Sequence, residues 1–132
     1  MTSEATPITS ARVGPQTPSN IQFLAICDDA EGLTYRLKDA DSPRIAVTVR
    51  FGNVIAYRVA DEGVLLDYWS RKLANTSHLL WELKGTEFLQ WMESASFQAH
   101  AIEDGVRHFI VVTATICLEA LTMHEPTVEV HD

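Results

Sequence analysis

The densest group of charged side chains follows a predicted strand, where Arg58 is succeeded by Asp61 and Glu62. Residues just past a strand often carry function, because a rigid element presents them. Together with Tyr57 and the distant His108, Arg58 would form a cationic, hydrogen-bonding set suited to an anionic or polar ligand. The competing interpretation is structural, with Arg58 and a neighbouring carboxylate forming a pair that fastens a turn.

The spacing of the residues supports neither a metal site nor a catalytic nucleophile. None of the five histidines stands in a short metal-ligand spacing, and we expect them at the surface or at strand ends. No GxSxG motif or glycine-rich phosphate loop occurs, and Ser94 and Ser96 fall on or just after a predicted helix. We therefore predict no metal, no cofactor and no catalytic residues, and a protein that is not an enzyme.

Three tryptophans, Trp69, Trp81 and Trp91, are expected in the core or at its edge, where aromatic rings contribute large buried areas. The alternative concerns the pair Tyr68-Trp69, which stands beside the acidic Asp67. Tyrosine and tryptophan are typical anchors of protein interfaces, so this pair could form an exposed recognition patch.

The net charge limits the class of partner, and the two cysteines indicate the cellular compartment. The 132 residues include 18 acidic and 10 basic ones, giving a formal charge of −8. Such a charge repels phosphate backbones, which argues against nucleic acid and favours a basic protein partner over it. The alternative is that the negative charge serves solubility alone. Cys27 and Cys117 form no disulfide framework, and we expect both as small buried hydrophobic residues in a reducing, cytoplasmic compartment.

The first twenty residues differ in composition from the rest and predict a flexible tail. They hold three prolines and many serines and threonines, without the apolar segment of a secretory signal. The rest, residues 21–132, is predicted to be one folded domain. It opens with two strands, 21–29 and 33–38, that form a hairpin around Ala30-Glu31-Gly32.

The next two strands, 45–51 and 54–59, flank Gly52-Asn53, which predicts a second hairpin. A two-residue loop would pair Phe51 with Val54 and would place the apolar faces of the two strands on opposite sides of the sheet. We therefore expect a bulged or three-residue turn that pairs Phe51 with Ile55. Further strands are expected at 64–69 and 78–84.

One helix, at 86–96, is predicted from apolar residues at helical spacing, with Thr86 as N-cap. The uncharged run from His108 to Leu118 is too short to span a membrane, and its density of β-branched residues favours strands. Two strands, about 107–113 and 117–123, with a turn near Ala114-Thr115 are the simplest solution, and one bent strand is the alternative. Glu119 is expected at a solvent-facing or paired position, and a terminal strand can follow Pro126.

The pattern of these segments resembles that of a family of small bacterial proteins of unknown function. The resemblance rests on Tyr57-Arg58 followed by Asp61-Glu62, then Trp91 with Glu93-Ser94 on a short helix, and last on His108-Phe109 opening an apolar hairpin that ends near Glu125-Pro126. It covers roughly residues 45–130. Small acidic proteins of this kind resemble immunity proteins that neutralise bacterial toxins, which implies a binding function through a protein partner.

We thus expect an α+β domain, mainly an antiparallel sheet of six or seven strands with one short helix near 86–96. The functional hypothesis is a non-enzymatic acidic protein that acts through a protein partner, and toxin neutralisation is its sharpest form. The alternative is a small-ligand-binding protein or enzyme with a polar site around Arg58 and His108. The candidate binding residues under these hypotheses are Tyr57, Arg58, Asp61, Glu62, Tyr68, Trp69 and His108.

Overall fold

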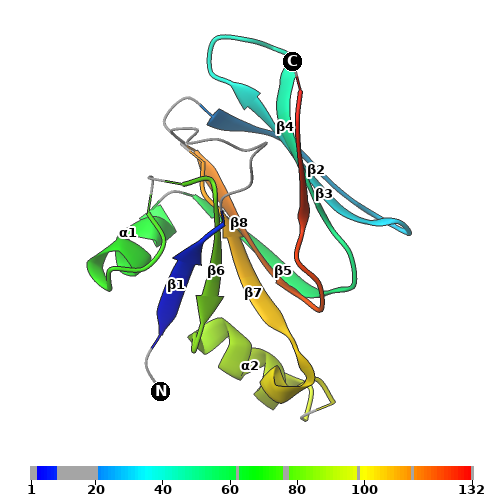
Figure 1. Cartoon of the computed structure of the whole chain (residues 1–132), viewed down its shortest axis with the longest axis vertical. Coiled ribbons are helices and arrows are strands. Elements are labelled where there is room, and N and C mark those ends of the chain that lie inside the picture. The colour runs from blue at the N-terminus through cyan, green and yellow to red at the C-terminus, as the bar shows by residue number, and fades with distance from the viewer. Residues whose placement is uncertain are drawn as a thin grey trace.

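The structure, a computed structural model, describes residues 3–8, 21–61, 63–75, 78–97, 99–113 and 115–131. Within them, two antiparallel sheets pack face to face and two helices cover the outer face of one sheet (Figure 1). Sheet A has the strand order β1 (Glu4–Pro7), β6 (Leu80–Lys84), β7 (Arg107–Val111), β8 (Ile116–Thr122) and β5 (Val54–Asp61). Sheet B has the order β2 (Ile21–Asp29), β3 (Gly32–Asp39), β4 (Ile45–Phe51) and β9 (Thr127–Val130).

The two helices, α1 (Gly63–Ser70) and α2 (Glu87–Ala95), are followed by a short 3-10 helix, η2 (Ile102–Asp104). The predicted α+β class is confirmed, and the sheet is mostly antiparallel as expected. The described residues form nine strands in two sheets, however, and not the expected six or seven in one.

The first hairpin, β2–β3, forms as predicted. Leu33, Tyr35 and Leu37 alternate along β3 with more exposed residues and point into the core. Gly32 starts β3 with a φ of 125°, a conformation that residues with a Cβ rarely adopt.

The predicted hairpin between β4 and β5 is wrong. Phe51 does not pair with Ile55, because the chain leaves sheet B at Gly52-Asn53 and enters sheet A. Phe51 lies opposite Leu33 on β3, while β5 pairs with β8. This corner resolves the conflict of apolar faces: each strand meets a neighbour in its own sheet, and neither has to expose its apolar side to water.

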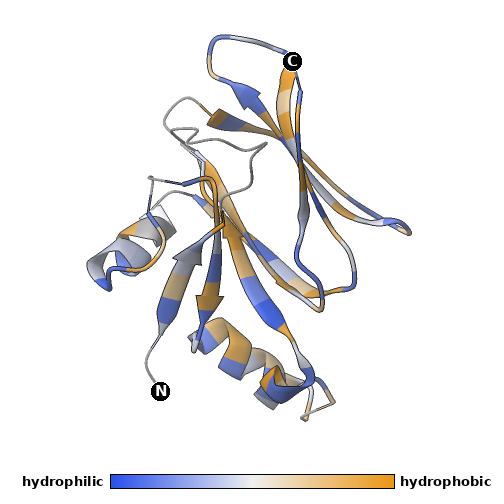
Figure 2. Cartoon of the chain, viewed as in Figure 1, coloured by the Kyte–Doolittle hydropathy of each residue, from blue (hydrophilic) through white to orange (hydrophobic). Residues whose placement is uncertain are grey.

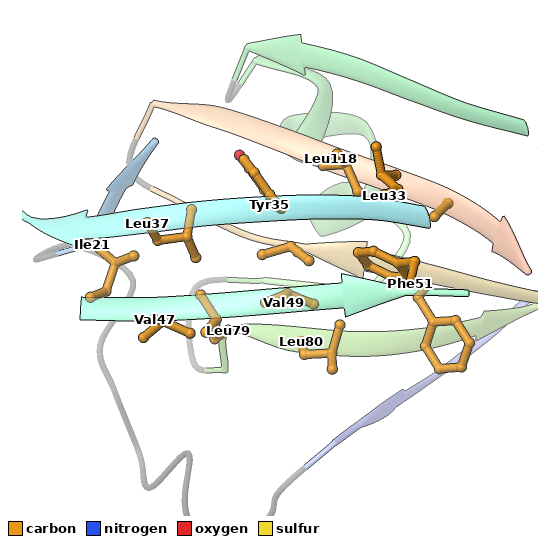
Figure 3. Close-up of a cluster of buried hydrophobic side chains, with 13 residues drawn as sticks. Ile21, Leu33, Tyr35, Leu37, Val47, Val49, Phe51, Leu79, Leu80 and Leu118 are labelled. Atoms are coloured by element: carbon orange, nitrogen blue, oxygen red, sulfur yellow. The ribbon is translucent and has the colours of Figure 1, made fainter. Parts of the chain in front are cut away.

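The main core lies between the two sheets. Figure 3 shows side chains of β3 and β4 facing those of sheet A across this layer. Val47, Val49 and Phe51 from β4 meet Leu80 and Leu118, and all of them are buried. A second apolar layer, on the other face of sheet A, packs against the helices.

The apolar run after Arg107 forms the predicted hairpin, β7–β8. The turn contains neither glycine nor asparagine among its described residues, and the side chain of Thr113 takes over their role. Its hydroxyl donates to the carbonyl of Ile116 and accepts from the amides of Thr115 and Ile116. Residue 114, at the centre of the predicted turn, lies outside the described residues.

Residues 64–69, predicted as a strand, form helix α1 instead. The Asp61 carboxylate accepts a hydrogen bond of 2.8 Å from the amide of Gly63 and so supports the first turn of the helix. Tyr68 then packs inward, in a cluster with Trp81 and Ile110 of sheet A, whereas Trp69 points outward. Leu66, which the alternation of a strand would place on the same face as Tyr68, is exposed.

Helix α2 begins and ends as predicted, with the Thr86 side chain accepting from the amide of Leu89. Figure 2 shows apolar and polar residues alternating along this helix. Phe88, Leu89 and Met92 are buried against sheet A, whereas Ala95, expected on the same face, is exposed.

The two ends of the described chain both join sheets. Within the predicted flexible tail, Glu4–Pro7 form β1, which pairs with β6; residues 9–20 lie outside the described residues. The predicted terminal strand after Pro126 is confirmed as β9, which pairs with β4. His131, which follows it, donates its amide to Ala46 and bonds through its ring to Thr48.

Neither cysteine forms a disulfide with the other, and Cys117 is buried as expected. The expectation for Cys27 is wrong, because this residue is exposed near the end of an edge strand. A hydrogen bond to Asp29 and the charge of that carboxylate raise the pKa of the Cys27 thiol, which makes it a poor nucleophile.

Candidate functional site

A carboxylate lies in the interior of the protein, in the middle of strand β8. The side chain of Glu119 is only 3% exposed. The register of the sheet places it directly opposite Arg58 of β5. Arg58 donates from Nε to Glu119 Oε2 at 2.7 Å and from Nη2 to Oε1 at 3.2 Å, which is a two-pronged ion pair.

His108 of β7 lies beneath this pair, fully buried. Its Nε2 is 2.8 Å from Glu119 Oε1 and its Nδ1 is 2.8 Å from the hydroxyl oxygen of Thr86. Because an ionised carboxylate only accepts hydrogen bonds, Nε2 must carry a proton. The Thr86 hydroxyl, which also accepts from the amide of Leu89, is thus the partner of Nδ1.

Tyr68 of α1 completes the group. Its hydroxyl donates to Glu119 Oε1 and accepts from Arg58 Nη2 at 3.1 Å. Burial of the phenol and the negative charge of Glu119 raise the pKa of Tyr68 well above its usual range, so the group stays protonated. We call Arg58, Tyr68, Thr86, His108 and Glu119 the Glu119 cluster.

The Glu119 cluster holds its carboxylate ionised despite the burial. Desolvation raises the pKa of Glu119, but the hydrogen bonds from His108, Arg58 and Tyr68 and the charge of His108 outweigh it and lower the pKa to about 2. A base of such low pKa is a weak proton acceptor near neutral pH. The cluster joins strands of sheet A to α1 and to the start of α2. It therefore suits a structural role better than it suits proton transfer.

Above the Glu119 cluster, the surface is hollowed on both sides of Arg58. One hollow, of about 480 Å³, lies between β5 and α2 and is mostly apolar; we call it the Phe88–Trp91 hollow. It is lined by Ala56, Tyr57, Arg58, Glu87, Phe88 and Trp91. The other hollow, of about 350 Å³, lies between the helices and is more polar. Its lining consists of Arg58, Asp67, Tyr68, Arg71 and Glu87.

No protein-family model, curated protein or solved structure matches the chain.

The walls of the two hollows are held by stacked and paired side chains. The guanidinium carbon of Arg58 lies 4.2 Å from the centre of the Phe88 ring, and Phe88 stacks on Trp91 at 5.6 Å. Arg71 bridges the helices by bonding to Asp67 and Glu87. These contacts make the rim of the hollows a defined surface built from both helices and β5.

Of the predicted site residues, the structure brings together Arg58, His108 and Tyr68. Tyr57 lies opposite Ala120, a residue of the core between the sheets, so its ring points to the face of the strand away from Arg58. Asp61 supports α1 and is not the partner of Arg58. Glu62 lies outside the described residues.

The predicted patch Tyr68-Trp69 is divided between interior and surface. Tyr68 is buried in the Glu119 cluster, whereas Trp69 is about half exposed on α1. Trp91, expected in the core or at its edge, is also about half exposed. Trp81 is buried as expected.

The sequence reasoning did not include Glu119, Thr86 and Phe88 among the site residues. Glu119 was expected at a solvent-facing or paired position, and the paired alternative is confirmed. The available signal was that Glu119 stands alone between the uncharged run that ends at Leu118 and the apolar residues that follow it, since a lone charge among apolar residues needs a buried partner.

Two classes of site find no support in the described part of the chain. It contains no group of three or more histidine, cysteine, aspartate or glutamate residues placed to hold a metal ion. None of its helices has the length and apolar character needed to cross a membrane.

Proposed function

We propose that this protein is a non-enzymatic binding protein whose partner docks over the two helices and β5. One observation carries the proposal: large apolar side chains stand exposed on both helices, and one of them, Trp91, lines a hollow. Trp69 and Trp91 each expose 54% of their surface, and Leu66 on α1 exposes 65%. Exposed tryptophans are typical anchors of protein interfaces.

The charge of this surface favours a basic partner. Asp67 and Glu87 expose most of their side chains at the rim, and the chain as a whole carries a formal charge of −8. Complementary charge increases the rate of encounter and suppresses wrong partners. The sharpest form of the proposal is an immunity protein that neutralises a basic bacterial toxin, which rests on the sequence resemblance and on this charge.

The alternative, a small-ligand site or enzyme around Arg58 and His108, is less well supported. His108 has no exposed surface, and both of its ring nitrogens have partners inside the protein. Arg58 reaches the hollows, but its Nε and Nη2 are engaged with Glu119 and Tyr68. A ligand could not contact both residues without breaking the Glu119 cluster.

Affinity capture with matched variants tests this proposal. The wild-type protein, Trp91→Ala and Phe97→Ala would be used as baits in extract of the source cells, with quantitative mass spectrometry of the captured proteins. Phe97 is almost fully exposed but lies outside the lining of both hollows, so it controls for loss of an exposed aromatic ring.

We expect a basic protein that binds wild type and Phe97→Ala and is reduced at least about tenfold with Trp91→Ala. Higher salt should weaken its binding. The proposal would be contradicted if no captured protein depended on Trp91 for binding. It would also be contradicted if a metabolite bound to the protein in contact with His108.

A further inference from the structure

In the part of the chain that the structure describes, strand β5 forms one edge of sheet A and is paired on one side only. Among the described residues, β8 is the only strand that pairs with it. After a register shift near Val54, the pairing with β8 runs without interruption from Ala56 to Asp61. The outward-facing amide and carbonyl groups of this regular stretch are a template for another strand.

The other three edges of the two sheets are shorter or irregular. Strand β1 has four residues and contains Pro7, which lacks an amide donor, and β9 also has four residues. Strand β2 is long, but its register shifts between Phe23 and Ala25. Bulges, prolines and short length are the usual devices that prevent edge pairing, and β5 has none of them beyond Ala56.

Both faces of the β5 edge offer apolar surface. On the helix side lies the Phe88–Trp91 hollow, directly beside Ala56 and Arg58. On the opposite side, Tyr57 and Val59 remain 37% and 41% exposed although they point to the face that carries the main core. An added strand, whose side chains alternate between the two faces, would therefore bury apolar residues on both.

We propose that β5 binds an extended, cationic segment of the partner protein as an additional strand of sheet A. This inference rests on the proposed binding function and specifies its mode. Backbone hydrogen bonds would supply affinity irrespective of sequence. Side chains in the Phe88–Trp91 hollow and beside Val59 would select the segment.

The charges around the edge select a cationic occupant. Asp67 and Glu87 share one arginine, Arg71, and Asp61 adds a carboxylate at the end of β5, which leaves an excess of negative charge among these residues beside the edge. Arg58 and Arg71 are already paired with carboxylates. A second copy of this chain would bring the same excess and its own net charge of −8 to the edge, so a basic segment of another protein is the better fit.

A peptide probe tests the mode of binding directly. The probe is a peptide of about ten residues that alternates lysine and valine, long enough to pair with β5. Its control is the same peptide with every backbone amide N-methylated, which keeps the charges and side chains but removes all backbone hydrogen-bond donors. The readout is hydrogen exchange of the β5 amides in the full chain.

We expect exchange in Val54–Asp61 to slow about tenfold with the unmodified peptide at millimolar concentration and to stay unchanged with the methylated one. Val59→Lys should reduce the effect at least about fivefold, because it places a like charge against the added strand. Phe97→Lys introduces the same charge at an exposed residue outside the lining of both hollows, and it should change the effect less than about twofold because a surface charge is screened by salt.

Unchanged exchange in β5, or equal slowing by both peptides, would overturn strand addition. If a Trp91-dependent partner is nevertheless captured, and its binding is insensitive to Val59→Lys, the proposed function stands while its mode is wrong. Slowing that appears without peptide and increases with protein concentration would mean that a second copy occupies the edge, which also overturns the inference.

Discussion

The buried side chain of Glu119 stabilises the fold only while it is ionised and hydrogen-bonded to its partners. Its folded-state pKa of about 2 lies below the ordinary value of 4.5, so its contribution to stability is complete above pH 4.5. The contribution is lost as the pH falls from 4.5 towards 2, because the unfolded chain then binds the proton first. This shift corresponds to roughly 3 kcal/mol.

We therefore expect Glu119→Gln to lower the free energy of unfolding at pH 7 by roughly 3 kcal/mol, because Arg58 loses its buried counter-charge. The variant should also flatten the fall in stability between pH 4.5 and pH 2. Urea unfolding at a series of pH values measures both effects. Equal pH profiles for variant and wild type would contradict the ionised cluster.

A matched control for this variant is Glu129→Gln. Glu129 pairs with Arg50 across sheet B, but both side chains are about half exposed. Exposed pairs contribute about 0–1 kcal/mol, so the control should remain close to wild type at all pH values. A loss as large as that of Glu119→Gln would mean that burial does not distinguish the two pairs.

At the scale of elements, two glycines next to β4 differ in what a side chain would meet. A Cβ added to Gly32 would lie 2.6 Å from the carbonyl oxygen of Phe51, and its φ of 125° is unfavourable for other residues. A Cβ on Gly52, at the corner between the sheets, would meet no atom within 4 Å.

We expect Gly32→Ala to lower the free energy of unfolding by about 2–4 kcal/mol, since the backbone of β4 would have to move. Gly52→Ala should change it by less than about 0.5 kcal/mol. Chemical denaturation of both variants gives the comparison. Equal stability would contradict the close approach of Gly32 to β4.

Strand β1 lies within the predicted tail but forms part of sheet A, so its removal should matter. Deleting residues 1–8 would expose the edge of β6 and remove the apolar contacts of Ala5 and Ile8. We expect a loss of about 2 kcal/mol or more in urea unfolding, together with self-association in gel filtration. A chain that starts at Ser3 is the control and should behave like wild type.

Local patterns were sufficient for those elements whose partners are close in sequence. The alternation in β3 and the β-branched run of β7 predict these two strands, and Thr86 predicts the start of α2. Each of these signals depends only on neighbouring residues. The corner at Gly52-Asn53 could not be predicted this way, since its apolar strands find partners far along the chain. Helix α1 was missed because its capping residue, Asp61, also suits a turn.

The same limit applies to the site. Residue type suggested that Arg58 and His108 belong together, and the structure places both on Glu119. The sequence could not show that this carboxylate neutralises them, because Arg58 and His108 meet Glu119 only through the register of three strands. The sequence also could not show that Trp91 would be exposed. The spacing of apolar residues along an amphipathic helix does not fix how the helix is rotated against the sheet.

At the scale of the whole molecule, the two sheets share one core. Residues of sheet B and sheet A form a single buried cluster, and Tyr35 of β3 donates its hydroxyl to the carbonyl of Ile116 in β8. Neither sheet could lose its partner without exposing that cluster to water. The prediction that residues 21–132 form one domain therefore has a direct thermodynamic test.

The three tryptophans make this test specific, because all lie on sheet A or its helices: Trp69 on α1, Trp81 on β6 and Trp91 on α2. Tryptophan fluorescence thus reports on sheet A, whereas far-UV circular dichroism reports on both sheets. We expect the two signals to follow one transition in urea with the same midpoint, as in two-state unfolding. Val49→Ala in sheet B should then lower the midpoint of the fluorescence transition as well, because removing a buried side chain from the shared core destabilises both sheets by about 1–3 kcal/mol. A fluorescence midpoint that does not respond to this variant would mean that the sheets unfold separately.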